Sequence, residues 1–303
     1  MLLPVLLFMA SAPLNPLTGA QPPLLPAPPD KHIFILSGQS NMVGLGGVVN
    51  HTWDCVVPQE CRADPSILRL TANLTWAEAR EPIHADIDAR HACGIGPGMP
   101  FAEAVRRGAG ARWVVGLVPC AMGGTRIGEW ERGGPFYGEM VGRAEAAVRD
   151  GGILRGLLWY QGESDTREWA DAAAYRARFR KFVHQLRSDL RSPGLPVIQV
   201  ALASGTGPFV EAVRRAQLGA HIANVSCVDA KRLPLEPDGL HLSTAAQVRL
   251  GQMMARDFLH YFAGPLPLPA SLAPRRRPLF VSLDLWTGIF FTLSFHVIVY
   301  DIL

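Results

Sequence analysis

This sequence has little net charge, and it lacks the motifs that mark several large classes of protein. Charged residues make up 18% of the 303 residues, and the net charge is +3. No dense basic stripe with interleaved aromatic residues is present, so we expect no nucleic-acid partner. Gly44, Gly46 and Gly47 do not form a GxGxxG motif and no Walker lysine follows them, which argues against a phosphate-binding loop.

Metal-ligand spacings are missing as well. No C-x2-C or H-x3-H pair, the spacings typical of zinc sites, occurs in the stretch that is richest in histidine and cysteine. The residues concerned are His51, Cys55, Cys61, His84, His91 and Cys93. We therefore expect no metal, and the sequence indicates no other cofactor.

The five cysteines fit a secreted protein with one or two disulfides and one free thiol. Cys120 ends one apolar run and Cys227 lies inside another, which predicts unreactive core thiols for both. Cys55, Cys61 and Cys93 share one irregular stretch, and we expect a disulfide between two of them. The sequence does not decide which two.

The N-terminal part of the chain differs from the middle. Residues 1–20 contain a short apolar segment followed by small residues, which predicts a secretory signal peptide, although no Lys or Arg precedes the apolar segment. We therefore expect a secreted, extracellular protein. Residues 21–30 are rich in proline and predict an extended linker.

Residues 264–303 are expected to lie outside the folded domain. They begin with a segment rich in proline and arginine and continue as a mostly apolar stretch from 279 to 303. That stretch has the length of a membrane span, but Asp284 and His296 interrupt it. Two alternatives stay open: a membrane anchor, or a tail without a membrane role.

Between residues 31 and 263, short apolar runs alternate with amphipathic segments. Five runs rich in Val, Ile and Leu are apolar on both faces, as expected for strands covered by helices. They cover residues 33–36, 113–118, 154–160, 196–201 and 225–228. Helices are predicted at 99–107, 137–149, 168–190, 208–222 and 243–262. This alternation predicts one α/β domain, with a doubly wound parallel sheet of five strands and helices on both faces.

Polar motifs follow several of the predicted strands. Ser40, the segments 123–125 and 161–163, and Asp238 with His241 each come soon after a strand candidate. Ligand sites in parallel sheets lie beyond the carboxyl ends of the strands. We therefore expect these motifs to meet at one edge of the sheet. The stretch 48–98 shows little periodicity, and we interpret it as an irregular excursion beside that edge.

Ser40, Asp238 and His241 are the residue types of a nucleophilic site. A serine is a poor nucleophile unless a base takes its proton and a third group orients that base. Asp238 and His241 are three positions apart, so one turn can hold a carboxylate beside an imidazole. Each residue also has an ordinary structural explanation, as a serine in a strand-to-helix turn, a turn-forming aspartate and a histidine at a helix start.

Four ordered motifs resemble those of one known family. They are Gly38-Gln39-Ser40-Asn41-Met42, Gly123-Gly124-Thr125 with Trp130, Trp159-Tyr160-Gln161-Gly162-Glu163, and Asp238-x-x-His241. Over about residues 31–262 the chain resembles the SASA-type carbohydrate esterases of the SGNH/GDSL hydrolase superfamily, and their plant branch most of all. This family includes acetylxylan esterases and sialate O-acetylesterases. The resemblance implies a flavodoxin-like SGNH hydrolase fold, no metal, and removal of acyl groups from sugar hydroxyls.

The resemblance also implies a role for each motif residue. Ser40 would be the nucleophile, His241 the general base and Asp238 the carboxylate that orients it. The oxyanion hole would consist of the backbone N–H groups of Ser40 and Gly124 and the side-chain amide of Gln161. Fixed donors of this kind stabilise the charge that forms when an ester is attacked.

Glu163, Thr125 and Trp130 are expected to support the site. Glu163 is either an alternative acid partner or a buried carboxylate that braces the loop, and we favour bracing. Trp130 could stack on a sugar or belong to the core. Met122 stands where members of the family often carry a small residue, which affects the shape of the pocket.

We therefore expect a secreted serine esterase that removes acetyl groups from carbohydrate, a cell-wall polysaccharide or glycoside, through an acyl-enzyme. One alternative is a general esterase of small or lipid esters, and another is a non-catalytic glycan-binding protein. The expected partner is the acetylated carbohydrate substrate, and a membrane only if residues 279–303 form an anchor. The sequence predicts neither the sugar nor the oligomeric state.

Overall fold

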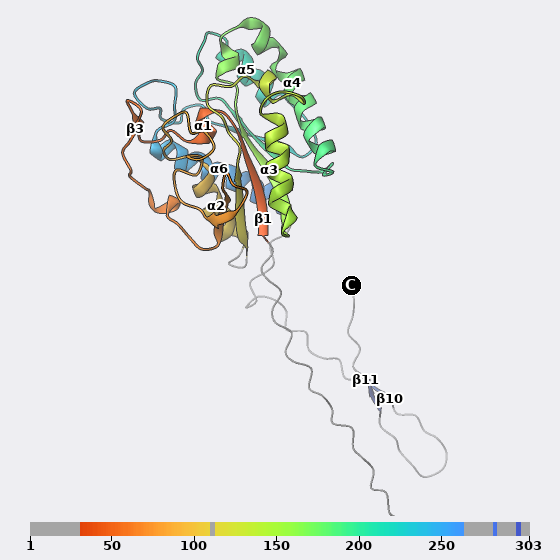
Figure 1. The fold of residues 1–303 in the computed structure, drawn as a ribbon. Coiled ribbons are helices and arrows are strands. Elements are labelled where there is room, and N and C mark those ends of the chain that lie inside the picture. The colour runs from red at the N-terminus through yellow and green to blue at the C-terminus, as the bar shows by residue number, and fades with distance from the viewer. Residues whose placement is uncertain (1–30, 110–112, 264–280, 284–294, 298–303) are drawn as a thin grey trace, which may run out of the picture.

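The computed structural model describes residues 31–109 and 113–263, together with two short strands near the end of the chain, Val281–Leu283 (β10) and Phe295–Val297 (β11) (Figure 1). These two strands pair with each other in antiparallel fashion. The predicted signal peptide 1–20, the linker 21–30 and most of the tail 264–303 lie outside the described residues. Within the described segments, no helix is both long and apolar enough to cross a lipid bilayer.

A mostly parallel sheet of seven strands forms the centre of the domain, in the order β5-β4-β6-β1-β7-β8-β9. Its strands are β1 (Lys31–Gly38), β4 (Ile67–Leu70), β5 (Trp76–Glu78), β6 (Val114–Pro119), β7 (Ile153–Tyr160), β8 (Val197–Ala201) and β9 (Val225–Asp229). The five predicted strands are β1, β6, β7, β8 and β9, and each adjacent pair among them is parallel. The predicted count of five is wrong, because β4 and β5 extend the sheet beyond β6.

Both additional strands come from the stretch 48–98, which the sequence predicted to be irregular. β4 has four residues and β5 has three, and runs this short carry too little periodicity to be recognised as strands. β4 pairs in parallel with β6, and β5 closes the edge in antiparallel fashion. The rest of the stretch includes a small hairpin of β2 (Val48–Val49) and β3 (Thr52–Trp53), and the 3-10 helix η1 (Gln59–Cys61).

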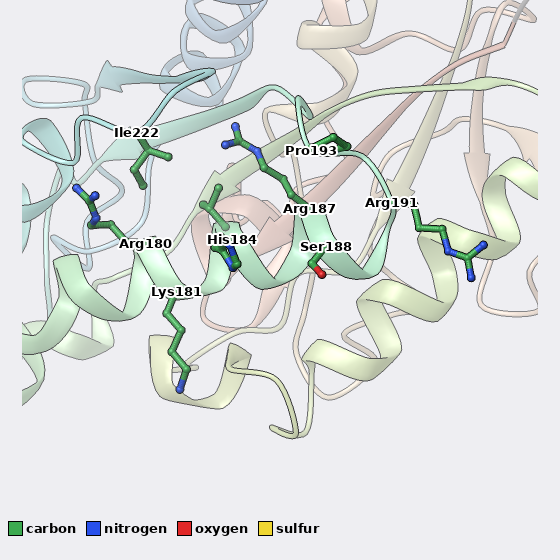
Figure 2. A pocket seen from close by; sticks show the side chains of 9 residues that line it. Arg180, Lys181, His184, Arg187, Ser188, Arg191, Pro193 and Ile222 are labelled. Atoms are coloured by element: carbon green, nitrogen blue, oxygen red, sulfur yellow. The ribbon is translucent and has the colours of Figure 1, made fainter.

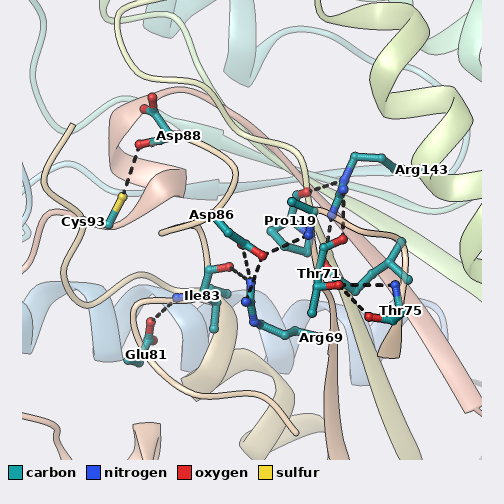
Figure 3. Close-up of polar contacts among 12 residues, drawn as sticks. Arg69, Thr71, Thr75, Glu81, Ile83, Asp86, Asp88, Cys93, Pro119 and Arg143 are labelled. Carbon is teal, nitrogen blue, oxygen red and sulfur yellow. Dashed lines mark hydrogen bonds and ion pairs between the residues drawn. The ribbon is translucent and has the colours of Figure 1, made fainter. Parts of the chain in front are cut away.

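Two arginines hold this stretch in place, one that lies within it and one that reaches it from elsewhere in the domain (Figure 3). Arg69 forms an ion pair with Asp86, with 2.6 Å between Nη1 and Oδ1. Arg143 is almost fully buried and donates hydrogen bonds to the carbonyls of Pro119 and Leu70, at 2.9 and 2.8 Å. Hydrogen bonds from charged donors are stronger than neutral ones. The stretch is therefore held firmly against the carboxyl end of β6.

Helices cover both faces of the sheet, as predicted. The long helices are α2 (Gly98–Ala109), α3 (Tyr137–Arg149), α4 (Trp169–Asp189), α5 (Val210–Leu218) and α6 (Thr244–Tyr261). Phe34 of β1 meets Phe101 of α2 and Phe258 of α6, each with 4.9 Å between ring centroids. Trp159 of β7 meets Phe182 of α4 at 4.5 Å. Figure 1 shows α2 and α6 together on one side of the sheet and α3 and α4 on the other.

All five cysteines are free thiols, so the predicted disulfide is wrong. Cys55 is exposed, whereas Cys61 and Cys93 are buried in the core. The Cys93 thiol lies 3.8 Å from the Asp88 carbonyl, to which it can donate. Burial raises the pKa of Cys93 and Cys120 to about 12. Because a thiolate is the reactive form, these buried thiols are unreactive, as predicted for Cys120.

Candidate active site

Ser40 begins the four-residue helix α1 (Ser40–Val43), directly beyond the carboxyl end of β1. The preceding turn is tight: the Gln39 N–H donates to the Tyr160 carbonyl at 2.9 Å. Gly38 has φ +136°, and a Cβ there would lie 2.0 Å from the same carbonyl oxygen. Only glycine fits this position. The serine therefore lies at a fixed point between β1 and β7, and the residue is 8% exposed.

His241 and Asp238 lie on the turn between β9 and α6, and the structure brings both to Ser40. The distance from His241 Nε2 to Ser40 Oγ is 3.0 Å, and that from His241 Nδ1 to Asp238 Oδ2 is 2.6 Å. The imidazole thus lies between the hydroxyl and the carboxylate, in the order that a serine nucleophile requires.

The Asp238 carboxylate has several hydrogen-bond donors. Its Oδ1 accepts from the backbone N–H groups of Leu240 and His241 at 2.9 and 3.0 Å. Burial acts to raise the pKa of Asp238, but the two backbone hydrogen bonds and the imidazole outweigh it and hold the pKa below its ordinary value. Asp238 is therefore ionised at neutral pH.

Asn41 joins the serine turn to the histidine turn, a role that the sequence reasoning missed. Its Oδ1 accepts from the Leu242 N–H at 2.8 Å, and its Nδ2 donates to Glu163 Oε1 at 2.8 Å. Gln247 of α6 donates to the Asn41 carbonyl at 3.1 Å. The position of Asn41 directly after Ser40 in a recognised motif was the available signal. Its polar groups fix the separation between nucleophile and base.

Glu163 lies under the site and contacts Asn41 rather than His241. It is fully buried, and its carbonyl accepts from the hydroxyls of Thr166 and Thr206 at 2.7 and 2.8 Å. Burial raises the pKa of Glu163 to about 7, against the effect of the hydrogen bond from Asn41. Through these contacts Glu163 joins Asn41, Thr166 and Thr206, which is a bracing role.

Gln161 is also fully buried, and this arrangement differs from the expected oxyanion role. Its Nε2 donates to the Thr125 carbonyl at 2.9 Å and to Asp165 Oδ2 at 2.6 Å. An amide nitrogen carries two hydrogens, so both are used inside the protein. Asp165 also accepts from the Ile127 N–H, and burial raises its pKa to about 6. Gln161 and Asp165 together hold the loop that follows β6.

Gly124 lies on this loop, which is anchored beside the serine turn by a hydrogen bond from the Met122 N–H to the Gly38 carbonyl at 3.0 Å. Gly124 is exposed and has φ +74°. In the described part of the chain, neither its N–H nor that of Ser40 donates a hydrogen bond. Both groups are available as oxyanion donors.

Thr125 and Trp130 belong to the interior of the same loop. Trp130, in the 3-10 helix η2 (Ile127–Trp130), is fully buried and donates through Nε1 to the Thr125 hydroxyl at 3.0 Å. That hydroxyl donates to the Met122 carbonyl at 3.0 Å. Trp130 is therefore a core residue, and stacking on a sugar is excluded for it.

A basic cavity of about 670 Å³ lies along the second half of α4 (Figure 2). Arg180, His184, Arg187 and Arg191 are among its lining residues, and none of the predicted site residues is.

Among residues 31–109 and 113–263, no group of three or more His, Cys, Asp or Glu side chains could hold a metal ion. The arrangement around Ser40, in contrast, brings together a nucleophile, a base and a carboxylate that orients the base.

Comparisons with known proteins point to one family. The family model described as carbohydrate esterase, sialic acid-specific acetylesterase (SASA) matches residues 30–260. A probable carbohydrate esterase of Arabidopsis thaliana is 52% identical over 244 residues, which cover 78% of this chain and 93% of the relative. An X-ray structure of an Arabidopsis thaliana protein with 52% identity superposes with a TM-score of 0.75 and covers 77% of this chain and 100% of that one.

Two more distant structures share the fold. NanS is 18% identical, with a TM-score of 0.63 over 77% of this chain and 98% of its own. A carbohydrate acetylesterase from Xanthomonas citri is 19% identical, with a TM-score of 0.56 over 78% of this chain and 57% of its own. The family model and the 52% identical relative both span most of the described domain, so this chain belongs to the SASA family of carbohydrate esterases and is a carboxylic ester hydrolase.

Proposed function

We propose that this protein is a serine esterase that removes acetyl groups from carbohydrate through an acyl-enzyme. The observation that carries the proposal is the hydrogen-bonded line from Ser40 Oγ through the His241 imidazole to Asp238 Oδ2, at 3.0 and 2.6 Å. A glycan-binding protein that performs no chemistry has no need of this series of hydrogen bonds.

In the first half of the reaction, Ser40 Oγ attacks the acetyl carbonyl carbon while His241 Nε2 accepts its proton. The ionised Asp238 stabilises the imidazolium that forms. His241 then donates the proton to the sugar oxygen, the bond between that oxygen and the acetyl carbon breaks, and the deacetylated sugar leaves. Acetyl-Ser40 remains.

In the second half, His241 takes a proton from water and the resulting hydroxide attacks the acetyl carbonyl of acetyl-Ser40. His241 returns the proton to Ser40 Oγ, and acetate is released. In both halves the carbonyl oxygen becomes negatively charged. The N–H groups of Ser40 and Gly124 stabilise that charge, because they are fixed by the fold and have no other acceptor in the described residues.

The substrate is an acetylated sugar in a cell-wall polysaccharide or glycoside. Support for an acetylated sugar comes from the family model, and support for a plant glycan comes from the Arabidopsis relative at 52% identity. Secretion rests on the apolar segment and small residues within positions 1–20. The five predicted strands lie in the order β6-β1-β7-β8-β9 within the sheet. Numbered along the chain among themselves, they have the order 2-1-3-4-5, which is the flavodoxin-like order and supports an SGNH fold.

The test is acetate release from acetylated xylan and from p-nitrophenyl acetate, with Ser40→Ala as the matched control. We expect the native protein to act on both and Ser40→Ala to lose at least about a thousandfold in kcat. Circular dichroism of both proteins verifies that each is folded.

Three outcomes would contradict the proposal in different ways. Full activity of Ser40→Ala would exclude the serine mechanism. Activity on p-nitrophenyl acetate alone would favour a general esterase of small esters. A folded native protein that releases nothing from either ester, and still binds the polysaccharide, would be a glycan-binding protein.

A further inference from the structure

The loop that carries Gly124 is held at several points. On one side, the Met122 N–H donates to the Gly38 carbonyl at 3.0 Å. On the other, the Thr125 carbonyl accepts from Gln161 at 2.9 Å. Gly123 and Gly124 lie between these anchors. Two consecutive glycines have wide conformational freedom, so an ordered turn here needs a further contact.

Asp88 supplies that contact. Its Oδ2 accepts a hydrogen bond from the Gly123 N–H at 2.9 Å, although the two residues are 35 positions apart. Its Oδ1 lies 2.9 Å from Nδ1 of His91. A Cβ on Gly123 would lie 3.0 Å from the same carboxylate oxygen, so the turn and the carboxylate are in close contact.

The burial of Asp88 is unusual for an acidic residue. Its side chain is 1% exposed, whereas the imidazole of His91 is half exposed and the guanidinium of Arg90 is 4.0 Å away and mostly exposed. Burying a carboxylate is costly unless it is hydrogen-bonded. One backbone N–H and one imidazole are the groups that compensate here. The backbone N–H is that of the residue before Gly124.

We propose that Asp88 is a positioning residue, which fixes the Gly123–Gly124 turn so that the Gly124 N–H points at the carbonyl oxygen of the ester. The proposal rests on the proposed function of Ser40 and Gly124. Gly123 is held by Asp88, while the Gly124 N–H has no acceptor among the described residues. An oxyanion donor stabilises the transition state only when its direction is set before the reaction.

The chain offers a matched control on the same turn. Asp86 is two residues from Asp88 and forms an ion pair with Arg69, not with the Gly123 turn. Asp88→Leu and Asp86→Leu therefore make the same chemical change on one turn, and only the first removes the contact with Gly123. Asp88→Asn keeps a side-chain oxygen that can accept from the Gly123 N–H.

The experiment measures kcat and KM on p-nitrophenyl acetate. The concentration of active sites, by which kcat is normalised, is determined by titration with diethyl p-nitrophenyl phosphate. We expect Asp88→Leu to lower kcat by at least about tenfold with little change in KM, because the lost contact acts mainly in the transition state. The rate of phosphorylation of Ser40 should fall in parallel, since the phosphoryl oxygen occupies the same position as the oxyanion. Asp88→Asn should recover most of kcat, and Asp86→Leu should lower the melting temperature without lowering kcat.

Three results would overturn the proposal: an unchanged kcat in Asp88→Leu, an Asp88→Asn variant as slow as Asp88→Leu, or an equal loss of kcat in Asp86→Leu. If Asp88→Leu does not fold, Asp88→Ser replaces it, because its short side chain does not reach the Gly123 N–H. Ser40→Ala is measured alongside. Activity that survives Ser40→Ala refutes the proposed function, whereas activity lost in Ser40→Ala but kept in Asp88→Leu refutes only the role of Asp88.

Discussion

The two sides of Ser40 hold carboxylates in opposite environments. On one side, the turn of Asp238 and His241 is open to solvent, and the Asp238 side chain is 47% exposed. On the other side, Glu163 and Asp165 are fully buried beneath the serine turn. All three carboxylates accept hydrogen bonds from neighbouring groups, so the contrast between them is one of solvation.

This contrast decides which carboxylate can assist the imidazole. Three hydrogen bonds in a partly solvated place hold the pKa of Asp238 below its ordinary value, whereas burial raises that of Glu163 to about 7 and that of Asp165 to about 6. A carboxylate that stabilises an imidazolium must carry its charge throughout the reaction. Asp238 meets this condition. Glu163 instead accepts a hydrogen bond from the Asn41 side-chain amide, and its raised pKa leaves it partly protonated at neutral pH.

The largest expected effect comes from removing the charge on the exposed side. Asp238→Asn should lower kcat by roughly a thousandfold or more, because the amide neither stabilises the imidazolium nor favours the tautomer that accepts the proton of Ser40. The measurement is kcat on p-nitrophenyl acetate at neutral pH.

Glu163→Gln is the matched change on the buried side. Its side-chain oxygen can still accept from Asn41, so kcat should fall far less than in Asp238→Asn. If the two variants lost kcat equally, Glu163 would share the role of acid partner and the distinction between the two sides would fail.

A second effect concerns stability, and here the buried side should dominate. The pKa of Glu163 is about 7 in the folded protein, against 4.5 as its ordinary value. Between these values the folded chain keeps a proton that the unfolded chain has lost, so stability falls as the pH rises through this range. From about pH 5 to about pH 8, the native protein should lose roughly 2 to 3 kcal/mol of unfolding free energy relative to Glu163→Gln. Urea unfolding at the two pH values measures the difference.

The opposite sign would be informative. A native protein that gains stability relative to Glu163→Gln as the pH rises would have an ionised Glu163 with a favourable partner. The environment of Glu163 would then resemble that of Asp238. A cation near Glu163 would have to stabilise its charge.

The sequence predicted the exposed side better than the buried side. Ser40, Asp238 and His241 follow strands whose apolar runs are easy to recognise, and the structure brings them within hydrogen-bonding distance. The strands β1, β6, β7, β8 and β9 were predicted for the same reason, because each contains a short apolar run in the sequence.

The contacts of the buried side depend on tertiary structure that no local pattern encodes. The acceptors of Gln161 include the Thr125 carbonyl, 36 positions away, which leaves its amide without the free N–H that the oxyanion role required. Asp88 and Gly123 are likewise joined only by the packing of the stretch 48–98, in which β4 and β5 were too short to be predicted. Family motifs identify the residues of a site, but they do not show which of their hydrogen bonds are already used.

The smallest expected effect tests whether the buried side is braced redundantly. The Tyr175 hydroxyl donates to the Gln161 carbonyl at 2.8 Å, but Gln217 donates to the same carbonyl at 3.0 Å. Tyr175→Phe should therefore cost only about 1 to 2 kcal/mol of unfolding free energy, mainly because the Trp159 Nε1–H at 3.3 Å loses its acceptor. The catalytic constant should stay unchanged, because Gln217 still holds Gln161.

Tyr261→Phe is the control for this change, since Tyr261 is 63% exposed and its loss of a hydroxyl should alter stability by less than about 0.5 kcal/mol. Both variants are compared by urea unfolding and by kcat on p-nitrophenyl acetate. A large fall of kcat in Tyr175→Phe would mean that Gln161 is held by one contact and acts on the reaction directly. The buried side would then contain a catalytic group, and the separation between an exposed relay and a buried brace would no longer hold.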